Sequence, residues 1–135
     1  MLSRTLRKKT GGAKILVVDD DRYVSAFMNI ILSQGGYEVV VAQDGFECID
    51  KAEKEKPDRI LLDFMMPNMD GLTTLASLKK SKETSDIPVI MVTASDDRKN
   101  VIRAQESGAS DYVVKPMDKA LLLERIASIL KKATV

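Results

Sequence analysis

Five short apolar runs divide this chain, and four of them end directly at a residue that carries polar chemistry. The runs are Ile15–Val18, Val39–Val41, Ile60–Leu62, Val89–Val92 and Tyr112–Val114. Three or four consecutive apolar residues without alternation are typical of strands that are buried on both faces of a parallel sheet. The segments between the runs have the i, i+3, i+4 apolar spacing of helices. The order is therefore strand then helix, repeated five times.

This alternation predicts a single α/β domain. The helical patterns cover about 22–34, 44–56, 70–78, 96–107 and 118–130. Right-handed crossovers place such helices on both faces of a parallel sheet. We therefore expect a doubly wound five-stranded parallel sheet with strand order 2-1-3-4-5 over residues 13–133. Residues 1–12 are rich in Arg and Lys and are expected to form a basic, flexible N-terminal leader.

Two of the predicted helices differ in how firmly they should be held. The fourth has few core candidates, namely Val101, Ile102 and Ala104. Because little apolar area is buried there, moving this helix should cost little free energy. The fifth carries Leu121–Leu123, which cannot all face inward, so some leucine surface is expected to remain for a partner.

Composition excludes several classes of protein. With 135 residues, 44% of them apolar and 30% charged, the chain is long enough for one globular domain. A net charge of +1 gives no argument for nucleic-acid or membrane binding. No apolar stretch approaches the roughly 20 residues of a membrane span, and the N-terminus has no apolar signal core, so a cytoplasmic location is expected. Cys48 has no partner for an intramolecular disulfide and is expected to lie in the core.

The chain has no histidine, so its chemistry depends on carboxylates, hydroxyls and lysine. Asp19–Asp21, Asp63, Thr93 and Lys115 each follow or end a predicted strand, and ligands in such sheets lie beyond the carboxyl ends of the strands. Carboxylates that converge there repel one another unless a cation joins them, and oxygen ligands suit Mg²⁺. Simpler explanations exist for each residue: a helix N-cap for the acids, with Asp21 expected as the cap, an ordinary β-branched strand residue for Thr93, and a surface lysine for Lys115.

The segment 63–71 reads Asp-Phe-Met-Met-Pro-Asn-Met-Asp-Gly. This segment resembles the phosphoacceptor loop of bacterial response regulator receiver domains. The acidic pair Asp19-Asp20, Thr93-Ala94 and Lys115-Pro116 also stand where that family has its motifs, and the resemblance extends from about residue 14 to residue 130. It implies a flavodoxin-like fold, similar to the stand-alone chemotaxis regulators.

The resemblance also implies a role for each matching residue at the metal site. Asp63 would be the phosphoacceptor, taking a phosphoryl group from a phosphohistidine on a sensor histidine kinase or a histidine phosphotransfer protein. Asp20 and Asp63 would hold Mg²⁺ together with the backbone carbonyl of Met65, and Asp19 would act mainly through bound water. Lys115 would pair first with Asp63 and then with a phosphoryl oxygen.

By the same resemblance, two residues would convert phosphorylation into a signal. Thr93 would donate a hydrogen bond to the phosphoryl group, and Tyr112 would then turn inward as the aromatic switch residue. The face formed by the fourth helix, the fifth strand and the fifth helix would change, and through it the protein would control an unknown partner, form a homodimer or pass the phosphate on in a phosphorelay. Such a receiver is a signalling protein that assists only its own phosphorylation and dephosphorylation, and direct DNA or membrane binding is not expected.

Three alternatives remain open at this point. Asp19-x-Asp21, with Thr93 and Lys115, resembles the motifs of haloacid dehalogenase-type phosphatases, although no downstream acidic pair fits their metal site and no cap domain is present. A flavodoxin-like flavin carrier would need a phosphate-binding loop after the first strand, where three aspartates would repel the phosphate. A degenerate receiver would serve only as a docking module.

Overall fold

The computed structural model describes residues 13–66, 68–94, 98–115, 120–121, 124–125 and 127–129. Five parallel strands form one sheet in the order β2-β1-β3-β4-β5, which confirms the predicted doubly wound order. The strands are β1 (Lys14–Val18), β2 (Glu38–Ala42), β3 (Arg59–Leu62), β4 (Val89–Thr93) and β5 (Asp111–Val114). The predicted leader over residues 1–12 lies outside the described residues.

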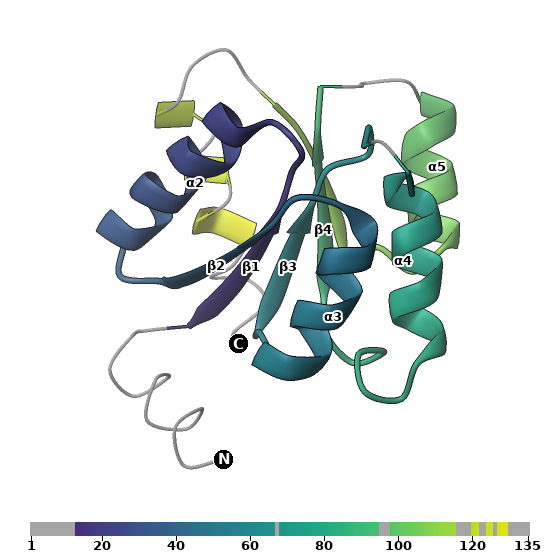
Figure 1. The fold of residues 1–135 in the computed structure, drawn as a ribbon. Helices are drawn as coiled ribbons and strands as arrows, with labels where there is room; N and C mark the ends of the chain where they lie inside the picture. Colours follow the sequence, from purple (N-terminus) through teal and green to yellow (C-terminus); the bar gives the residue numbers. More distant parts are fainter. Residues whose placement is uncertain are drawn as a thin grey trace.

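Helices cover both faces of this sheet. They are α2 (Arg22–Gln34), α3 (Gly45–Glu55), α4 (Gly71–Lys80) and α5 (Arg98–Glu106), and the described residues between 120 and 129 are helical as well. Figure 1 shows α2 and this last helical segment on one face, with α3, α4 and α5 on the other. Within the described part of the chain, no helix has the length and apolar content that a membrane span requires.

The strands bury alternate side chains in two separate cores. Leu16, Ile60 and Met91 belong to the core under α3, α4 and α5, together with buried residues of those helices. Ile15 and Leu61 belong to the core under α2, where Ile129 of the last helical segment also packs. Because both faces of β1 and β3 are covered, these strands read as continuous apolar runs, as the sequence indicated.

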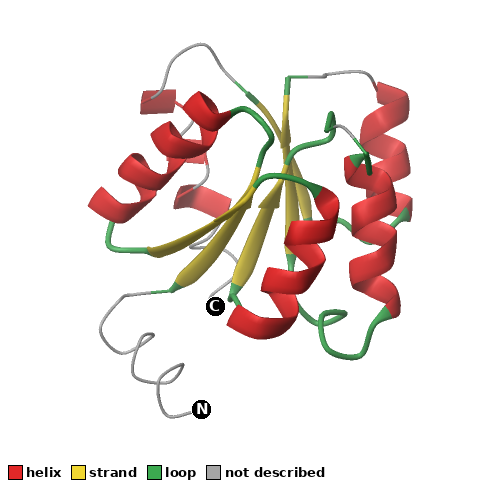
Figure 2. Cartoon of the chain, in the orientation of Figure 1, coloured by secondary structure: helices red, strands yellow, loops and turns green. Residues whose placement is uncertain are grey.

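Aspartate side chains cap three of the helices, in the loops that follow β1, β2 and β3. Asp21 accepts hydrogen bonds from the backbone N–H groups of Tyr23 and Val24, and thereby caps α2 as predicted. Asp44 and Asp70 cap α3 and α4 in the same way. The loops that follow β1 and β3 lie at the carboxyl edge of the sheet (Figure 2).

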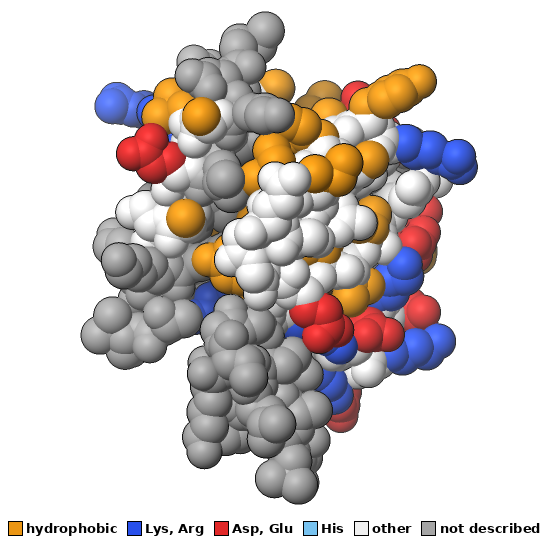
Figure 3. Space-filling model, turned by 90° about the vertical axis from the view of Figure 1, so that its left-hand side faces the viewer, with side chains coloured by type: hydrophobic (Ala, Val, Ile, Leu, Met, Phe, Trp, Pro, Cys, Tyr) orange, Lys and Arg blue, Asp and Glu red, His pale blue; other side chains and the backbone are white. Residues whose placement is uncertain are grey.

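The outer surface of the α2 side keeps apolar side chains in contact with solvent. Figure 3 shows hydrophobic groups distributed among polar and charged ones on this face. On α2 itself, Tyr23 is 89% exposed and Ile30 is 58% exposed. These side chains add nothing to the core, so they are free to contact another molecule.

The helix α5 is weakly anchored, as expected, but the residues that it buries are not all those expected. Ala104 is fully buried, but Ile102, a predicted core residue, is 46% exposed. The expectation for Ile102 was wrong because the helix turns that side chain toward solvent. Gly108, with φ of +102°, lies just past α5 and provides the left-handed turn that ends the helix.

Cys48 gives a test of the core under α3. The side chain is fully buried, and burial raises the pKa of its thiol to about 12, with the negative charge of Asp44 adding to the effect. The thiol therefore stays protonated at neutral and moderately alkaline pH, and we expect it to resist iodoacetamide in the native protein. Mass spectrometry should detect alkylation only after unfolding in urea. Rapid alkylation of the native protein at pH 8 would contradict this packing.

Candidate functional site

The neighbouring strands β1 and β3 bring their following aspartates together. Val18 and Leu62 are paired in the sheet, so the next residues, Asp19 and Asp63, emerge side by side. The ladder continues for one more hydrogen bond, from the backbone N–H of Asp63 to the carbonyl of Val18 at 3.0 Å. Residues that are 44 positions apart in the sequence are therefore held at one point on the sheet edge.

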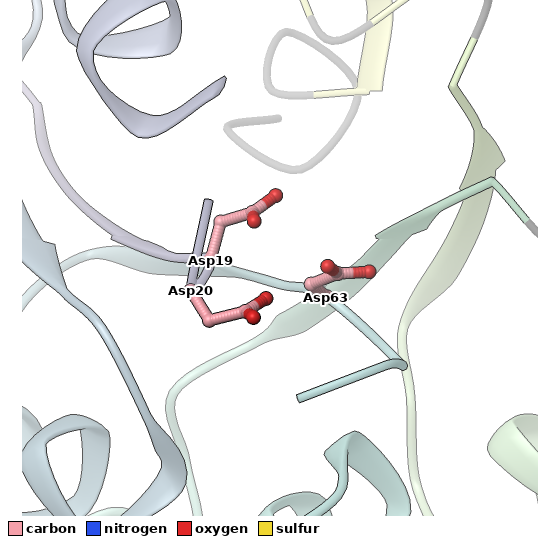
Figure 4. Close-up of side chains that lie close together, drawn as sticks. All are labelled: Asp19, Asp20 and Asp63. Atoms are coloured by element: carbon pink, nitrogen blue, oxygen red, sulfur yellow. The ribbon is translucent and has the colours of Figure 1, made fainter. Parts of the chain in front are cut away.

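Asp19, Asp20 and Asp63 place one carboxylate oxygen each within 4.8 Å of one another. Figure 4 shows the side chains of Asp19 and Asp20 both extending from the end of β1 toward the side where Asp63 lies. Asp19 and Asp63 are buried, at 4% and 7% exposure, whereas Asp20 is exposed. Oxygen ligands, one solvent-facing side and no nitrogen or sulfur donor are a set that suits Mg²⁺, which keeps several water ligands.

Lys115 supplies the positive charge of this site from the end of β5. Its Nζ atom lies 2.7 Å from Oδ2 of Asp19 and 3.5 Å from Oδ2 of Asp63. The other oxygen of Asp19 accepts a hydrogen bond from the backbone N–H of Asp21 at 2.9 Å. Both oxygens of Asp19 are thus engaged, and its closer pairing with Lys115 was not predicted from the sequence.

Burial and neighbouring charge alter proton affinity at this site. Burial raises the pKa of Asp63 above its ordinary value, and the charge of Asp19 adds to this, while Lys115 and the backbone N–H groups of Met65 and Phe64 oppose it. Burial alone would lower the pKa of Lys115, but its hydrogen bond to Asp19 and the two negative charges outweigh burial and raise it. Lys115 is therefore a permanent cation at neutral pH.

A small cavity of about 20 Å³ lies behind the carboxylates, and Asp19, Asp63 and Lys115 form part of its lining. Its remaining walls are mainly the apolar side chains of Val17, Val18, Val24, Met28, Leu61 and Val92. This volume holds about one water molecule. The apolar wall explains why Asp63 is poorly solvated on its inner side.

The raised pKa of Asp63 makes its ionised form unfavourable for folding when no metal is bound. A carboxyl group with a raised folded-state pKa binds its proton more tightly in the folded protein, so stability rises as pH falls through that pKa. Above it, the ionised group costs stability. In EDTA at neutral pH we expect Asp63→Asn to melt at a higher temperature than the unmodified protein, with a smaller difference at acidic pH. A lower melting temperature for Asp63→Asn under both conditions would contradict the burial argument; exposed Asp50→Asn is the control.

The other predicted residues lie on β4, on β5 and in the loop after β3. Thr93 ends β4, where its backbone pairs with Val114, but its side chain lies outside the described residues. Tyr112 is partly buried and packs against the core under α3, α4 and α5. Met65 is 66% exposed, so its side chain packs little against the protein and the loop fixes the position of its backbone only. The structure thus brings together the three aspartates and Lys115.

Sequence reasoning missed the backbone groups that contact Asp63. The backbone N–H groups of Phe64 and Met65 act on its carboxylate and lower its pKa against the effect of burial. Any residue except proline supplies such a donor, so no side-chain type in the sequence signals it. For the same reason, the sequence did not indicate that both oxygens of Asp19 have partners, because one of these partners is the backbone N–H of Asp21.

The site and sheet order together define a known class of signalling domain. Residues 15–127 match the sequence model of the response regulator receiver domain, and the chain belongs to this family. Receiver domains are the phosphorylation-responsive parts of two-component systems. This membership leaves the dehalogenase-type phosphatase and the flavin carrier without support.

Individual relatives show how far the similarity extends. The chain is 39% identical over 119 residues to the DNA-binding dual master transcriptional regulator RpaA of Synechocystis, a match that covers 88% of this chain and 49% of RpaA. The structure of chemotaxis protein CheY4 of Vibrio cholerae superimposes with a TM-score of 0.80 at 30% identity, covering 87% of this chain and 98% of CheY4. The BeF3-activated receiver domain of Klebsiella pneumoniae RstA matches with a TM-score of 0.76 at 35% identity, covering 84% and 95%. The chain therefore spans about half the length of RpaA but nearly all of a single-domain relative.

Proposed function

We propose that this chain is a phosphorylation-dependent switch in which Asp63 accepts a phosphoryl group from the phosphohistidine of a sensor histidine kinase or a histidine phosphotransfer protein. The observation that carries the proposal is the grouping of Asp63 with Asp19 and Asp20 within 4.8 Å and with the Lys115 ammonium 3.5 Å away. A nucleophilic carboxylate beside a metal-binding group and a fixed cation suits the transfer of a phosphoryl group.

Each residue has a defined part in this proposal. Asp63 attacks phosphorus through a carboxylate oxygen, so an O–P bond forms while the N–P bond of the donor breaks and its electron pair stays on the imidazole nitrogen. Asp20, Asp63 and the carbonyl of Met65 would hold Mg²⁺, which would neutralise charge on the transferring oxygens. Lys115 lies close enough to Asp63 to meet a phosphoryl oxygen there, and Asp19 keeps its ammonium in place.

The signal would leave the site through β4, β5 and α5. An acyl phosphate on Asp63 carries about −1.5 to −2 charge next to Lys115, in place of the single negative charge of the free carboxylate. Reversing a two-state balance from 1:99 to 99:1 needs about 5.5 kcal/mol, and one charge-assisted hydrogen bond supplies about 1.5–3 kcal/mol. Thr93 and Lys115 acting together therefore approach the required scale. Ala104 is the only described residue of α5 that is fully buried, so this helix can shift at low cost.

The proposal extends to location and partners. We place the switch in the cytoplasm, and its target would bind the face made by α5, β5 and the last helical segment, where Leu121 is 38% exposed. This face would also serve for a homodimer, and the phosphate could instead pass to a histidine in a phosphorelay. RpaA is a DNA-binding regulator. For this chain, the absence of direct DNA binding remains a prediction.

The proposal is tested by incubating the unmodified protein with acetyl phosphate and Mg²⁺. Mass spectrometry should show one added phosphoryl group, which hydroxylamine removes because it cleaves acyl phosphates. EDTA should prevent the addition. A protein that binds Mg²⁺ but gains no phosphoryl group would instead support the docking-module alternative.

A further inference from the structure

Gly45 occupies a crowded position at a distance from the acceptor carboxylate. It is the first residue of α3, directly after the cap Asp44, and α3 lies beside α4 on one face of the sheet (Figure 1). A Cβ atom on residue 45 would lie 2.7 Å from Sδ and 3.0 Å from Cβ of Met69, and closer still to Oγ1 of Thr74. Real Cβ atoms do not approach other atoms so closely, so these neighbours would have to move.

Side-chain rotation at Thr74 and Met69 does not remove all of the close contacts with a Cβ on residue 45 unless a hydrogen bond is lost. Thr74 is fully buried, and its hydroxyl donates a hydrogen bond to the carbonyl of Asp70 at 2.9 Å, which rotation would break. Met69 can swing its sulfur away, but its Cβ position is set by the backbone. Relief of the contact that keeps the Thr74 hydrogen bond therefore requires the main chain at Met69 and Asp70 to shift.

The main chain that follows Asp70 packs directly against the backbone of the acceptor residue Asp63. The N–H group of Gly71 donates to the carbonyl of Phe64 at 2.8 Å. The fit is so close that a Cβ on Gly71 would lie 2.7 Å from Cα of Phe64 and closer still to the carbonyl oxygen of Asp63. A shift at Asp70 is thus transmitted to the peptide between Asp63 and Phe64, which is part of the backbone that carries the Asp63 carboxylate.

We infer that Gly45 is a positioning residue for phosphoryl transfer: its missing side chain lets α3 seat Met69 and Thr74 so that the loop 63–71 holds Asp63 in its reactive orientation. The atoms nearest to a Cβ on residue 45 belong to Met69 and Thr74, so Gly45 acts through the start of α4 and the residue before its cap. The inference rests on the proposed role of Asp63. The requirement for glycine is steric, because alanine is the better helix former.

The test is Gly45→Ala, with two readouts. We expect the rate of phosphorylation by acetyl phosphate at saturating Mg²⁺ to fall at least tenfold. We also expect the amide resonances of Phe64 and Met65 to shift in heteronuclear NMR spectra without metal or phosphate. Gly35→Ala is the matched control, because a Cβ there meets its nearest atoms at an ordinary 3.4 Å, and both readouts should stay unchanged.

A double-mutant cycle separates positioning from general damage. In a Thr74→Ala background the closest contact is gone, so Gly45→Ala should reduce the rate several-fold less than it does in the unmodified protein. If Gly45→Ala alone does not fold, the Phe64 and Met65 resonances are compared between Thr74→Ala and the Gly45→Ala/Thr74→Ala double variant, where the remaining contact with Met69 should still shift them. Unshifted Phe64 and Met65 resonances, or equal losses in both backgrounds, would overturn the inference. Failure of the unmodified protein to accept phosphate would instead overturn the proposed function, and the resonances would still decide the role of Gly45.

Discussion

The Asp63→Asn variant is expected to gain no phosphoryl group from acetyl phosphate under conditions that phosphorylate the unmodified protein completely. An amide oxygen is a far weaker nucleophile than a carboxylate, and the variant also lacks a negatively charged metal ligand. The fold should survive, because Lys115 keeps its shorter contact with Asp19. Intact-protein mass spectrometry with and without Mg²⁺ measures the result.

Asp50→Asn is the matched control for this experiment. Asp50 lies on α3 in an exposed ion pair with Lys54, so the same change of side chain is made away from the site. This control should be phosphorylated as fast as the unmodified protein. Undiminished phosphorylation of Asp63→Asn would show that another residue is the acceptor.

Replacing Lys115 by methionine is expected to destabilise the metal-free protein by about 3–5 kcal/mol at neutral pH, the usual cost of removing one partner of a buried ion pair. The side chain of Asp19 is 5% exposed and that of Lys115 is 22% exposed, so water replaces little of the lost interaction. Urea unfolding in EDTA measures this change. Mg²⁺ should stabilise the variant more than it stabilises the unmodified protein, because it supplies the missing positive charge.

Two further variants show whether the loss comes from Asp19. Adding Asp19→Asn to Lys115→Met removes the unpaired charge, so the double variant should regain much of the lost stability. Lys54→Met breaks only an exposed pair and should change stability by less than about 1 kcal/mol. A Lys115→Met variant as stable as Lys54→Met would show that the pair between Lys115 and Asp19 contributes no more than an exposed ion pair.

The sheet could be predicted because local sequence and topology agree. Runs such as Ile60–Leu62 have no polar side chain for a solvated face, so both faces must be covered. Once two such strands are parallel neighbours, their carboxyl ends meet, and Asp19 and Asp63 must lie close together. The caps were equally predictable, because Asp21 and Asp44 stand where a helix needs an acceptor for its free N–H groups.

What the sequence could not predict depends on distances between elements. The preference of Lys115 for Asp19 over Asp63 follows from where β5 ends relative to β1, a distance that no local pattern encodes. Ile102 was assigned to the core from its apolar character, but the way α5 packs leaves it in solvent. The crowding at Gly45 likewise exists only when α3 and α4 are packed together.

A crystal structure with Mg²⁺ and beryllofluoride would show directly whether the fold gathers oxygen ligands that are distant in the sequence around one divalent ion. We expect one ion at about 2.0–2.1 Å from carboxylate oxygens of Asp20 and Asp63 and from the carbonyl of Met65, with beryllofluoride attached to Asp63 and facing Lys115. Asp20 and Asp63 turned apart, with neither Mg²⁺ nor beryllofluoride at Asp63, would contradict this expectation.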